Sequence, residues 1–394
     1  MVHRCLALAC LVAAAGCHAG SVWPVLPPLG EANPLPEGPR QGITVEVPQL
    51  DLPPSAPPSH YRHLTVEECR RRAFQATPLA DILAAPTAFL GLQHFKHTDG
   101  EIWNLIRAYA ADELRNRHIA ETLSDFYRLA AAEGQYDRLR QAEQLLQDQA
   151  QSLEKAGQQG VRSAQDLLTV QRQLLEVRSR LAQLESLRIA INAVLAERLG
   201  LPTADPPLWP VVKLQVDPRD VAVEAAVDLA LTYRPDLNLL RLLLRADGRS
   251  LAQAEGLLQA LHPLLSAAPS PSPLQTLLAD WRKAPTLWEQ RWRSQVEAVL
   301  HTRQRQVMGE VRAAIAGRQG QRTVAAARQT QVEFWRQQQT ELEKRQAAGQ
   351  AVTAELLAAR LELLQAEAAL LQAVADWHRA DLQLRQALGL LVRE

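Results

Sequence analysis

Few side chains in this sequence have types and spacings that could do chemistry. His60 and His63, and likewise His94 and His97 close to acidic residues, have the spacing of possible metal ligands. Isolated pairs of this kind are usually solvated loop histidines, so we expect no metal ion and no cofactor. No glycine-rich loop follows a strand, and no serine, histidine and acidic residue form a nucleophile motif. The sequence therefore predicts that the protein is not an enzyme.

Two cysteines lead to different predictions. Cys69 lies beside Arg70, Arg71 and Arg72, whose charges could lower the pKa of its thiol, but a packing role in a helix explains it as well. Cys17 directly follows a segment with the features of a secretion signal. With one other cysteine left beyond that segment, the chain has no disulfide framework.

Residues 1–16 form the predicted signal peptide. An apolar run of 11 residues, Cys5 to Ala15, is too short to span a bilayer as a helix. Its end, Ala14-Ala15-Gly16-Cys17, resembles the lipobox of bacterial lipoproteins, which implies cleavage after Gly16 and acylation of Cys17. Because His18 is not the aspartate that favours inner-membrane retention, we expect a lipid anchor in the outer membrane, facing the periplasm. The alternative is an ordinary signal peptide that contains a cysteine.

The composition restricts the choice of partners. The chain has 43 basic and 43 acidic residues, so no bulk positive charge is available to hold a nucleic acid. Residues 17–59 contain eleven prolines and no apolar periodicity, which favours an extended tether. A tail with no spacing role is the alternative, and both place the folded domain at residues 60–394.

The folded domain contains an internal repeat. A shift of 157 residues superposes Val66-Glu67 on Val223-Glu224 and Pro78 on Pro235. A shift of 189 residues superposes, without a gap, Leu153-Glu154-Lys155 on Leu342-Glu343-Lys344, Gly160 on Gly349, and Leu199-Gly200-Leu201 on Leu388-Gly389-Leu390. We therefore expect two copies of one unit, at about 64–201 and about 221–390.

The periodicity within each unit is helical. Apolar residues recur every 3.5 to 3.6 residues over 167–184, which indicates a helix that buries one stripe. A proline-free stretch of about 101–156 precedes it, and the break near Gly160 is followed by a helix start at Asp166. Gly349 and Glu355 repeat this pattern in the second unit. The sequence thus predicts an all-α fold of two long antiparallel helical hairpins.

Several short motifs occur in an order that resembles the TolC-like outer-membrane efflux family over about residues 60–390. They are Leu64-Thr65-Val66-Glu67-Glu68, Tyr233-Arg234-Pro235-Asp236-Leu237, Gly160 with Asp166-Leu167-Leu168, Gly349 with Glu355-Leu356-Leu357, and the unit-ending Leu199-Gly200 and Leu388-Gly389. The resemblance implies a homotrimer whose helices form a periplasmic cylinder, joined to a periplasmic adaptor and an inner-membrane transporter. It also implies that Gly160, Asp166, Gly349 and Glu355 form hairpin tips that dock the adaptor; the alternative is that they are plain hairpin corners.

One feature departs from the family pattern. Each family repeat contains a β-hairpin that spans the outer membrane, with strands of alternating apolar and polar residues. Here only residues 87–97 suggest such a strand, and residues 263–293 contain four prolines and no alternation. We therefore expect these β-hairpins to be weak or absent, with the lipid on Cys17 as the firm attachment.

Three tryptophans lie among basic residues in the second of these stretches. Trp281, Trp288 and Trp292 beside lysine and arginine suit a lipid headgroup region, which predicts that this part of the chain rests on a membrane. The alternative is that Trp288 and Trp292, four residues apart on one helix face, are packing residues.

Two functions from different classes fit these observations. The first is an efflux component that forms a periplasmic conduit for small molecules or proteins. The second is a lipid-anchored helical scaffold or adaptor of the cell envelope that does not conduct.

Overall fold

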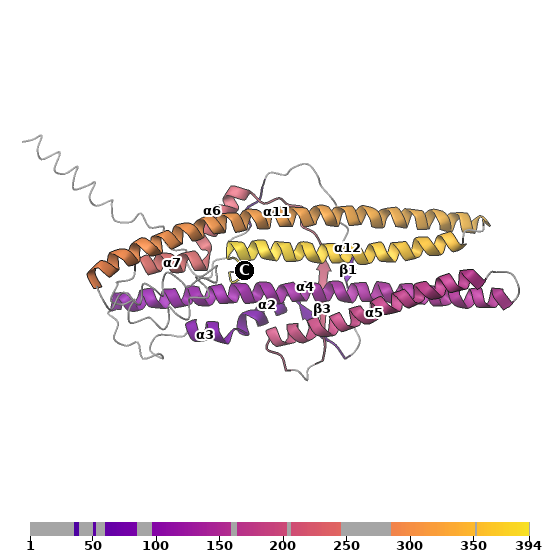
Figure 1. The fold of residues 1–394 in the computed structure, drawn as a ribbon, viewed down its shortest axis with the longest axis horizontal. Helices are drawn as coiled ribbons and strands as arrows, with labels where there is room; N and C mark the ends of the chain where they lie inside the picture. The colour runs from indigo at the N-terminus through magenta and orange to yellow at the C-terminus, as the bar shows by residue number, and fades with distance from the viewer. Residues whose placement is uncertain are drawn as a thin grey trace, which may run out of the picture.

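The computed structural model describes residues 35–38, 50–52, 60–84, 97–158, 164–202, 206–245, 285–350 and 353–393. Four long helices run along the longest axis of the molecule (Figure 1). Helices α4 (His97–Gln158) and α5 (Ala164–Arg198) form one antiparallel hairpin, and α11 (Pro285–Ala347) and α12 (Thr353–Leu388) form the other. The 62 residues of α4 span about 93 Å. The predicted helical fold with two long hairpins is confirmed.

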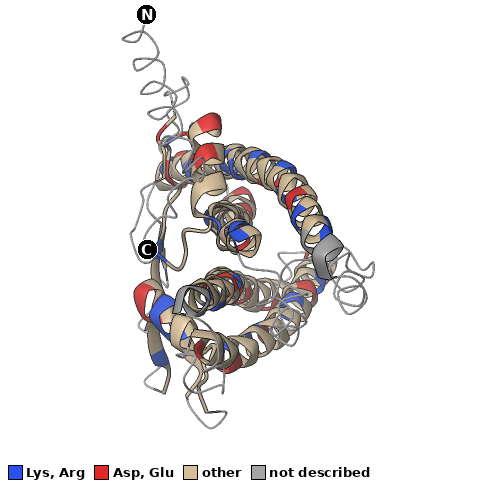
Figure 2. Cartoon of the chain, turned by 90° about the vertical axis from the view of Figure 1, so that its left-hand side faces the viewer, with Lys and Arg blue, Asp and Glu red and all other residues tan. Residues whose placement is uncertain are grey.

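The hairpins pack side by side. Helix α12 contacts both α11 and α4, and α4 also contacts α5. The order across the molecule is therefore α11, α12, α4, α5, which leaves α5 and α11 as its two edges. Seen along the long axis, basic and acidic residues are spread over all the long helices (Figure 2), as the balanced charge of the sequence leads one to expect.

The element boundaries follow the two sequence shifts. Helices α2 (Val66–Gln75) and α3 (Pro78–Ala84) begin 157 residues before α6 (Val223–Tyr233) and α7 (Pro235–Arg245). The end of α4 and the start of α5 correspond, at a shift of 189, to the end of α11 and the start of α12. Helices α3 and α7 lie at the end of the molecule opposite the two hairpin turns (Figure 1).

A small sheet lies between the repeats. Its strand order is β1 (Leu50–Leu52), β3 (Leu208–Leu214), β2 (Arg62–Thr65), with β3 antiparallel to β1 and parallel to β2. Upstream, the N–H of Gly38 donates to the C=O of Asp220 at 2.8 Å. Residues 35–38 and 50–52, which the sequence assigned to a tether, are thus hydrogen-bonded to the folded body. The edge of β3 has free backbone groups with which a short extended segment can pair.

The segments in which the family has β-hairpins lie largely outside the described residues. Of residues 87–97, only His97 is described, at the start of α4. Of residues 263–293, only 285–293 are described, and they form the first turns of α11. Residues 102–106, whose pattern fits a helix as well as a strand, are helical. No helix in the described ranges combines the length and the apolar character that crossing a bilayer requires.

Three of the long helices end on a glycine with left-handed backbone. Gly200, Gly349 and Gly389 have φ angles of 64°, 84° and 73°. At each, the glycine N–H donates to the C=O three residues earlier, and the next N–H donates to the C=O five residues before its own residue. This paired arrangement is the Schellman motif, which glycine favours because it has no Cβ. It ends α5, α11 and α12.

Replacing Gly389 with alanine should reduce stability more than replacing Gly349. Both variants must hold alanine at positive φ, at a cost of about 1–2 kcal/mol. A Cβ at Gly389 would also lie 3.0 Å from Cδ of Pro235 and 3.1 Å from Cα of Arg234, whereas a Cβ at Gly349 has nothing within 4 Å. Denaturant unfolding followed by circular dichroism measures the difference. Equal stabilities of the two variants would contradict the close contact between α12 and α7.

The apolar core is widest away from the hairpin turns. One cluster joins α4, α6, α7, α11 and α12 around Trp103 and Trp292, and a second joins α2, α4, α5 and α12 around Phe126 and Trp377. Only small clusters, such as Leu146 with Leu153 and Val170, lie nearer the turns. The body is therefore held by a broad core at the short helices, which narrows to seams between paired helices.

Candidate functional site

The two hairpin turns lie at the same end of the molecule (Figure 1). Asp166 and Glu355 are exposed in the first turns of α5 and α12. Acidic residues at these positions suit the positive end of the helix dipole, which stabilises the hairpin corners. Gly349 occupies the turn before α12, while Gly160 lies outside the described residues. Three of the four predicted tip residues are thus brought to one end, where they present exposed charges and a glycine turn.

The other predicted site residues are spread over the chain. Cys17 and Trp281 lie outside the described residues. Trp288 lies on α11, one helical turn before Trp292. Trp292 is 1% exposed and packs in the first core cluster, so it is a packing residue and is not available to a membrane surface. This was the alternative interpretation of that residue.

Cys69 is also a packing residue. Its side chain is fully buried in the second core cluster. Burial, followed by the charges of Asp125 and Glu68, raises the pKa of the thiol, so the neighbouring arginines do not activate it. In the ranges that the structure describes, no three His, Cys, Asp or Glu side chains are placed to hold a metal ion.

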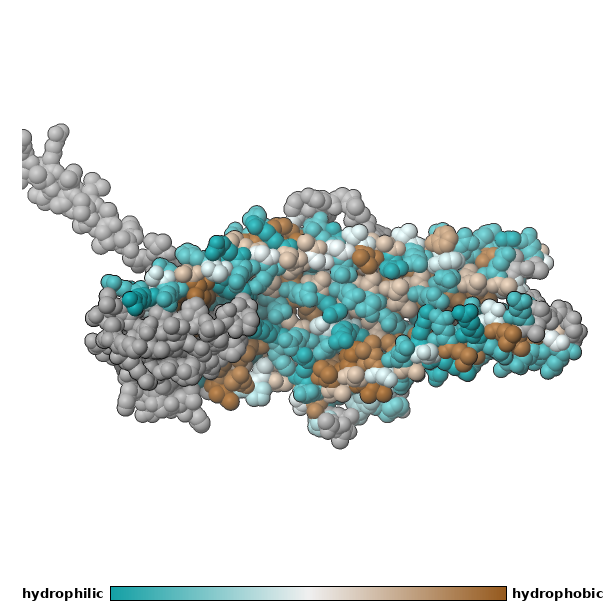
Figure 3. Space-filling view, viewed as in Figure 1, coloured by the Kyte–Doolittle hydropathy of each residue, from teal (hydrophilic) through white to brown (hydrophobic). Residues whose placement is uncertain are grey.

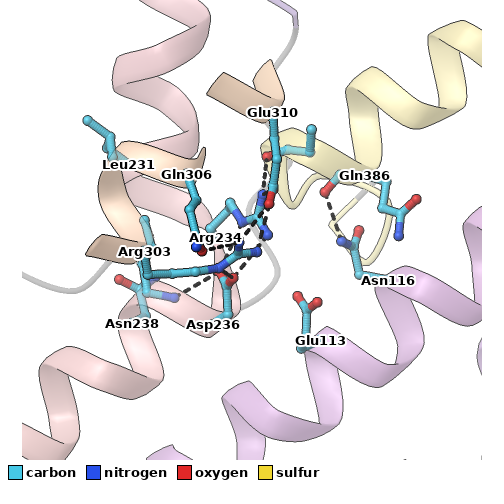
Figure 4. A network of polar contacts seen from close by, with 12 residues as sticks. Glu113, Asn116, Leu231, Arg234, Asp236, Asn238, Arg303, Gln306, Glu310 and Gln386 are labelled. Carbon is cyan, nitrogen blue, oxygen red and sulfur yellow. Dashed lines mark hydrogen bonds and ion pairs between the residues drawn. The ribbon is translucent and has the colours of Figure 1, made fainter. Parts of the chain in front are cut away.

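A buried ion-pair network lies where α12 ends and α7 begins (Figure 4). Arg234 donates two hydrogen bonds of 2.9 Å to the carboxylate of Asp236 in the first turn of α7. Arg303 on α11 donates to Oδ2 of Asp236 at 2.8 Å. Arg234 also donates to Glu310 on α11 and to the C=O of Ala387 in the last turn of α12. The network therefore links α7, α11 and the end of α12.

The charges of this network shift two carboxyl pKa values in opposite directions. Burial alone would raise the pKa of Asp236, but the guanidinium groups of Arg234 and Arg303 outweigh it and hold that pKa below its usual value. Glu113 on α4 faces the network (Figure 4), and burial together with the charge of Asp236 raises its pKa, although Arg117 donates to it at 2.7 Å. Glu113 thus favours its neutral form at this position.

A cleft of about 520 Å³ adjoins the network and is lined by Glu113, Arg117, Arg234, Arg303 and Glu310 among other residues. Each of these five charged side chains has an oppositely charged partner within the protein. Such a cluster can hold helix ends in register. Sequence analysis treated Arg234 and Asp236 only as a motif. The signal it missed is a pair of opposite charges beside the uniformly apolar run of α7, where a charge must be paired if it is buried.

A second cluster lies on the seam between α4 and α12. The rings of Tyr127 and His378 stack with centroids 4.3 Å apart. Burial lowers the pKa of His378 to about 4, so the stacked imidazole is neutral at neutral pH. Arg318 on α11 donates to Asp381 at 2.7 Å, and its guanidinium lies 5.0 Å from the ring centre of Trp377.

The two edge helices expose apolar side chains. On α5, Leu168, Leu175 and Ile189 are each about two-thirds exposed, and on α11 Phe334 is half-exposed. Leu79 and Ile82 on α3 are exposed as well. In the space-filling view, apolar surface gathers along the α3 and α5 edge (Figure 3). Contiguous exposed apolar surface of this kind marks a contact with another molecule.

Compared by sequence, the chain matches no protein-family model and no curated protein. Its structure is similar to the outer membrane protein VceC of Vibrio cholerae, with a TM-score of 0.54 and 14% identity over 82% of this chain and 96% of that chain. The open state of the MtrE outer membrane channel of Neisseria gonorrhoeae gives 0.53 and 14%, over 94% and 99%. The CmeC outer membrane channel of Campylobacter jejuni gives 0.52 and 13%, over 74% and 66%.

Proposed function

Because the chain has the fold of TolC-like outer membrane factors, we propose that it is one protomer of a homotrimeric outer-membrane efflux conduit. Its long helices would line a periplasmic cylinder for the export of small molecules or proteins. Its hairpin tips would dock a periplasmic adaptor joined to an inner-membrane transporter. The number of copies and the partners are those that the family resemblance implies.

The observation that carries this proposal is the pair of open edges. Helices α4 and α12 are covered on both sides, whereas α5 and α11 each have a long helix on one side only. The exposed leucines and isoleucine of α5 are large apolar side chains that a solitary protein would keep buried. A second copy of the chain, with its α11 against this α5, would cover both edges, and repetition of that contact around an axis would close a ring.

Attachment to the membrane forms part of the same proposal. Acylation of Cys17 would place the N-terminus of the mature chain at the outer membrane. Trp281 and Trp288 remain proposed contacts with the lipid surface, whereas the buried Trp292 is excluded from them. Incorporation of a palmitate analogue that is lost in the variant Cys17→Ser would support the anchor.

A deletion experiment tests conduction. Cells of the bacterium that carries the protein, once its gene is deleted, should accumulate a fluorescent efflux substrate, and the intact gene should restore export. The double variant Asp166→Arg/Glu355→Arg reverses the charge at both exposed tips and should assemble but fail to restore export, because the proposed docking surface is altered. Glu224→Arg reverses an equally exposed charge on α6 and serves as the control.

The contrary outcome is equally specific. If deletion leaves accumulation unchanged but weakens the cell envelope, the protein is a non-conducting scaffold. Full export by the tip variant would remove Asp166 and Glu355 from the docking surface.

A further inference from the structure

The covered seam between α4 and α12 predicts how two copies meet. The shift of 189 residues converts α4 into α11 and α5 into α12. A contact between α4 and α12 within the chain therefore has a counterpart between α11 of one copy and α5 of the next. This step rests on the proposed assembly, and it fixes a register of residue pairs.

Polar and aromatic contacts hold the covered seam together. Its five hydrogen-bonded or stacked pairs are Asn116 with the C=O of Gln386 at 3.0 Å, Ser124 with Arg379 at 3.1 Å, Tyr127 with His378, Gln135 with Gln372 at 2.9 Å, and Arg138 with Glu367 at 2.7 Å. The last is an ion pair between half-buried side chains. All ten residues except Gln372 are buried or half-buried.

The counterparts of these residues are all exposed. In the same order, and with α11 named first, the pairs are Arg305 with Glu197, Ala313 with Ala190, Ala316 with Ile189, Val324 with Gln183, and Ala327 with Arg178. Ile189, one of the most exposed apolar residues of α5, is matched with the small Ala316. Arg305 and Glu197 carry opposite charges, so the register is sterically and electrostatically compatible.

The two seams differ in what holds them. The covered seam has an ion pair, an amide pair and a ring stack, whereas four of the five counterpart pairs contain alanine or valine, which cannot reproduce these contacts. Small residues allow two helices to approach closely but do not fix their position along the axis. The single ion pair Arg305 with Glu197 would be exposed to solvent and therefore weak.

We infer that α11 of one copy packs on α5 of the next in this register, and that this sparsely bonded seam slides while the seam within the chain stays fixed. Changes in the width of the conduit would then arise between copies. The pair of hairpins in one chain would move as one body.

Crosslinking tests the register. In the full-length acylated protein, the double variant Ile189→Cys/Ala316→Cys should be joined by a short bismaleimide into species of two and three chains. Ala182→Cys/Ala316→Cys moves one cysteine by seven residues on the same exposed face, about 10 Å along the helix, and should not crosslink. Each single variant is a further control. The native Cys69 is buried and should stay unreactive.

An introduced charge tests the sliding. Ala327→Glu places an acid opposite Arg178 of the next copy and recreates, with exchanged signs, the pair of Arg138 and Glu367. Subunit exchange between labelled oligomers should become about two- to fivefold slower than in Ala327→Gln. Ala327→Lys should speed exchange, and Ala327→Lys/Arg178→Glu should reverse that effect, with Arg178→Glu alone as its control.

The outcomes separate the inference from the function. Oligomers that form without a crosslink at the 189 and 316 positions, or crosslink better at 182 and 316, would overturn the register and leave the conduit proposal standing. Equal exchange rates for the Glu, Gln and Lys variants would overturn the sparsely bonded seam. A chain that remains a monomer would instead overturn the proposed function.

Discussion

Asp236→Ala should lower the free energy of unfolding by about 3–5 kcal/mol, because it removes one partner from a buried ion-pair network. The carboxylate is 2% exposed and accepts hydrogen bonds from Arg234 and Arg303. Without it, two guanidinium groups lie at a helix junction with only Glu310 to balance them. Denaturant unfolding of the oligomer at fixed protein concentration measures the loss.

A surface ion pair provides the matched control. Glu224 and Arg312 lie 3.3 Å apart with more than half of each side chain exposed, and Glu224→Gln should change stability by less than about 1 kcal/mol. If Asp236→Ala were as mild as this control, the junction of α12 with α7 would be solvated or differently paired, and the network would not hold the helices together.

Trp292→Ala should lower the free energy of unfolding by about 3–5 kcal/mol through the cavity it leaves in the core. The indole is 1% exposed and packs in the cluster that joins α4, α7 and α11. Binding of the unlipidated protein to liposomes should not change in this variant, provided it is measured at a temperature at which the variant stays folded.

The same two measurements on Trp281→Ser and Trp288→Ser complete this test. Weaker liposome binding with unchanged stability would support the membrane contact proposed for these two residues, and unchanged binding would remove it. A Trp292→Ala protein that keeps its stability and loses liposome binding would contradict the buried position of Trp292.

The long hairpins could be predicted because their signals are local. The apolar stripe of α5 and the breaks near Gly160 and Gly349 each depend on residues close in sequence, and the repeat supplied each signal twice. The glycine helix ends at 200 and 389 followed from the same pattern. One detail differs, because α4 continues through Gly134, where we considered an interruption: the neighbouring helices bury this turn and offset the low helix propensity of glycine.

The ion-pair junction could not be predicted because its members come from distant parts of the chain. Arg234, Arg303 and Glu310 meet only when α7 and α11 pack together. Trp292 illustrates the same limit, since a tryptophan beside arginines fits a membrane surface and a core equally well in sequence. The strand at Leu50–Leu52 was missed because proline-rich surroundings hide a three-residue pairing that the edge of β3 makes possible.

The measurement that tests the account most directly is the oligomeric state and shape of the unlipidated protein from residue 18 onward. Light scattering and negative-stain electron microscopy in mild detergent determine both. We expect a trimer that forms a hollow cylinder, because the exposed edges of α5 and α11 are covered only when copies close a ring. A monomer or a solid rod, found again with the acylated protein, would contradict the conduit.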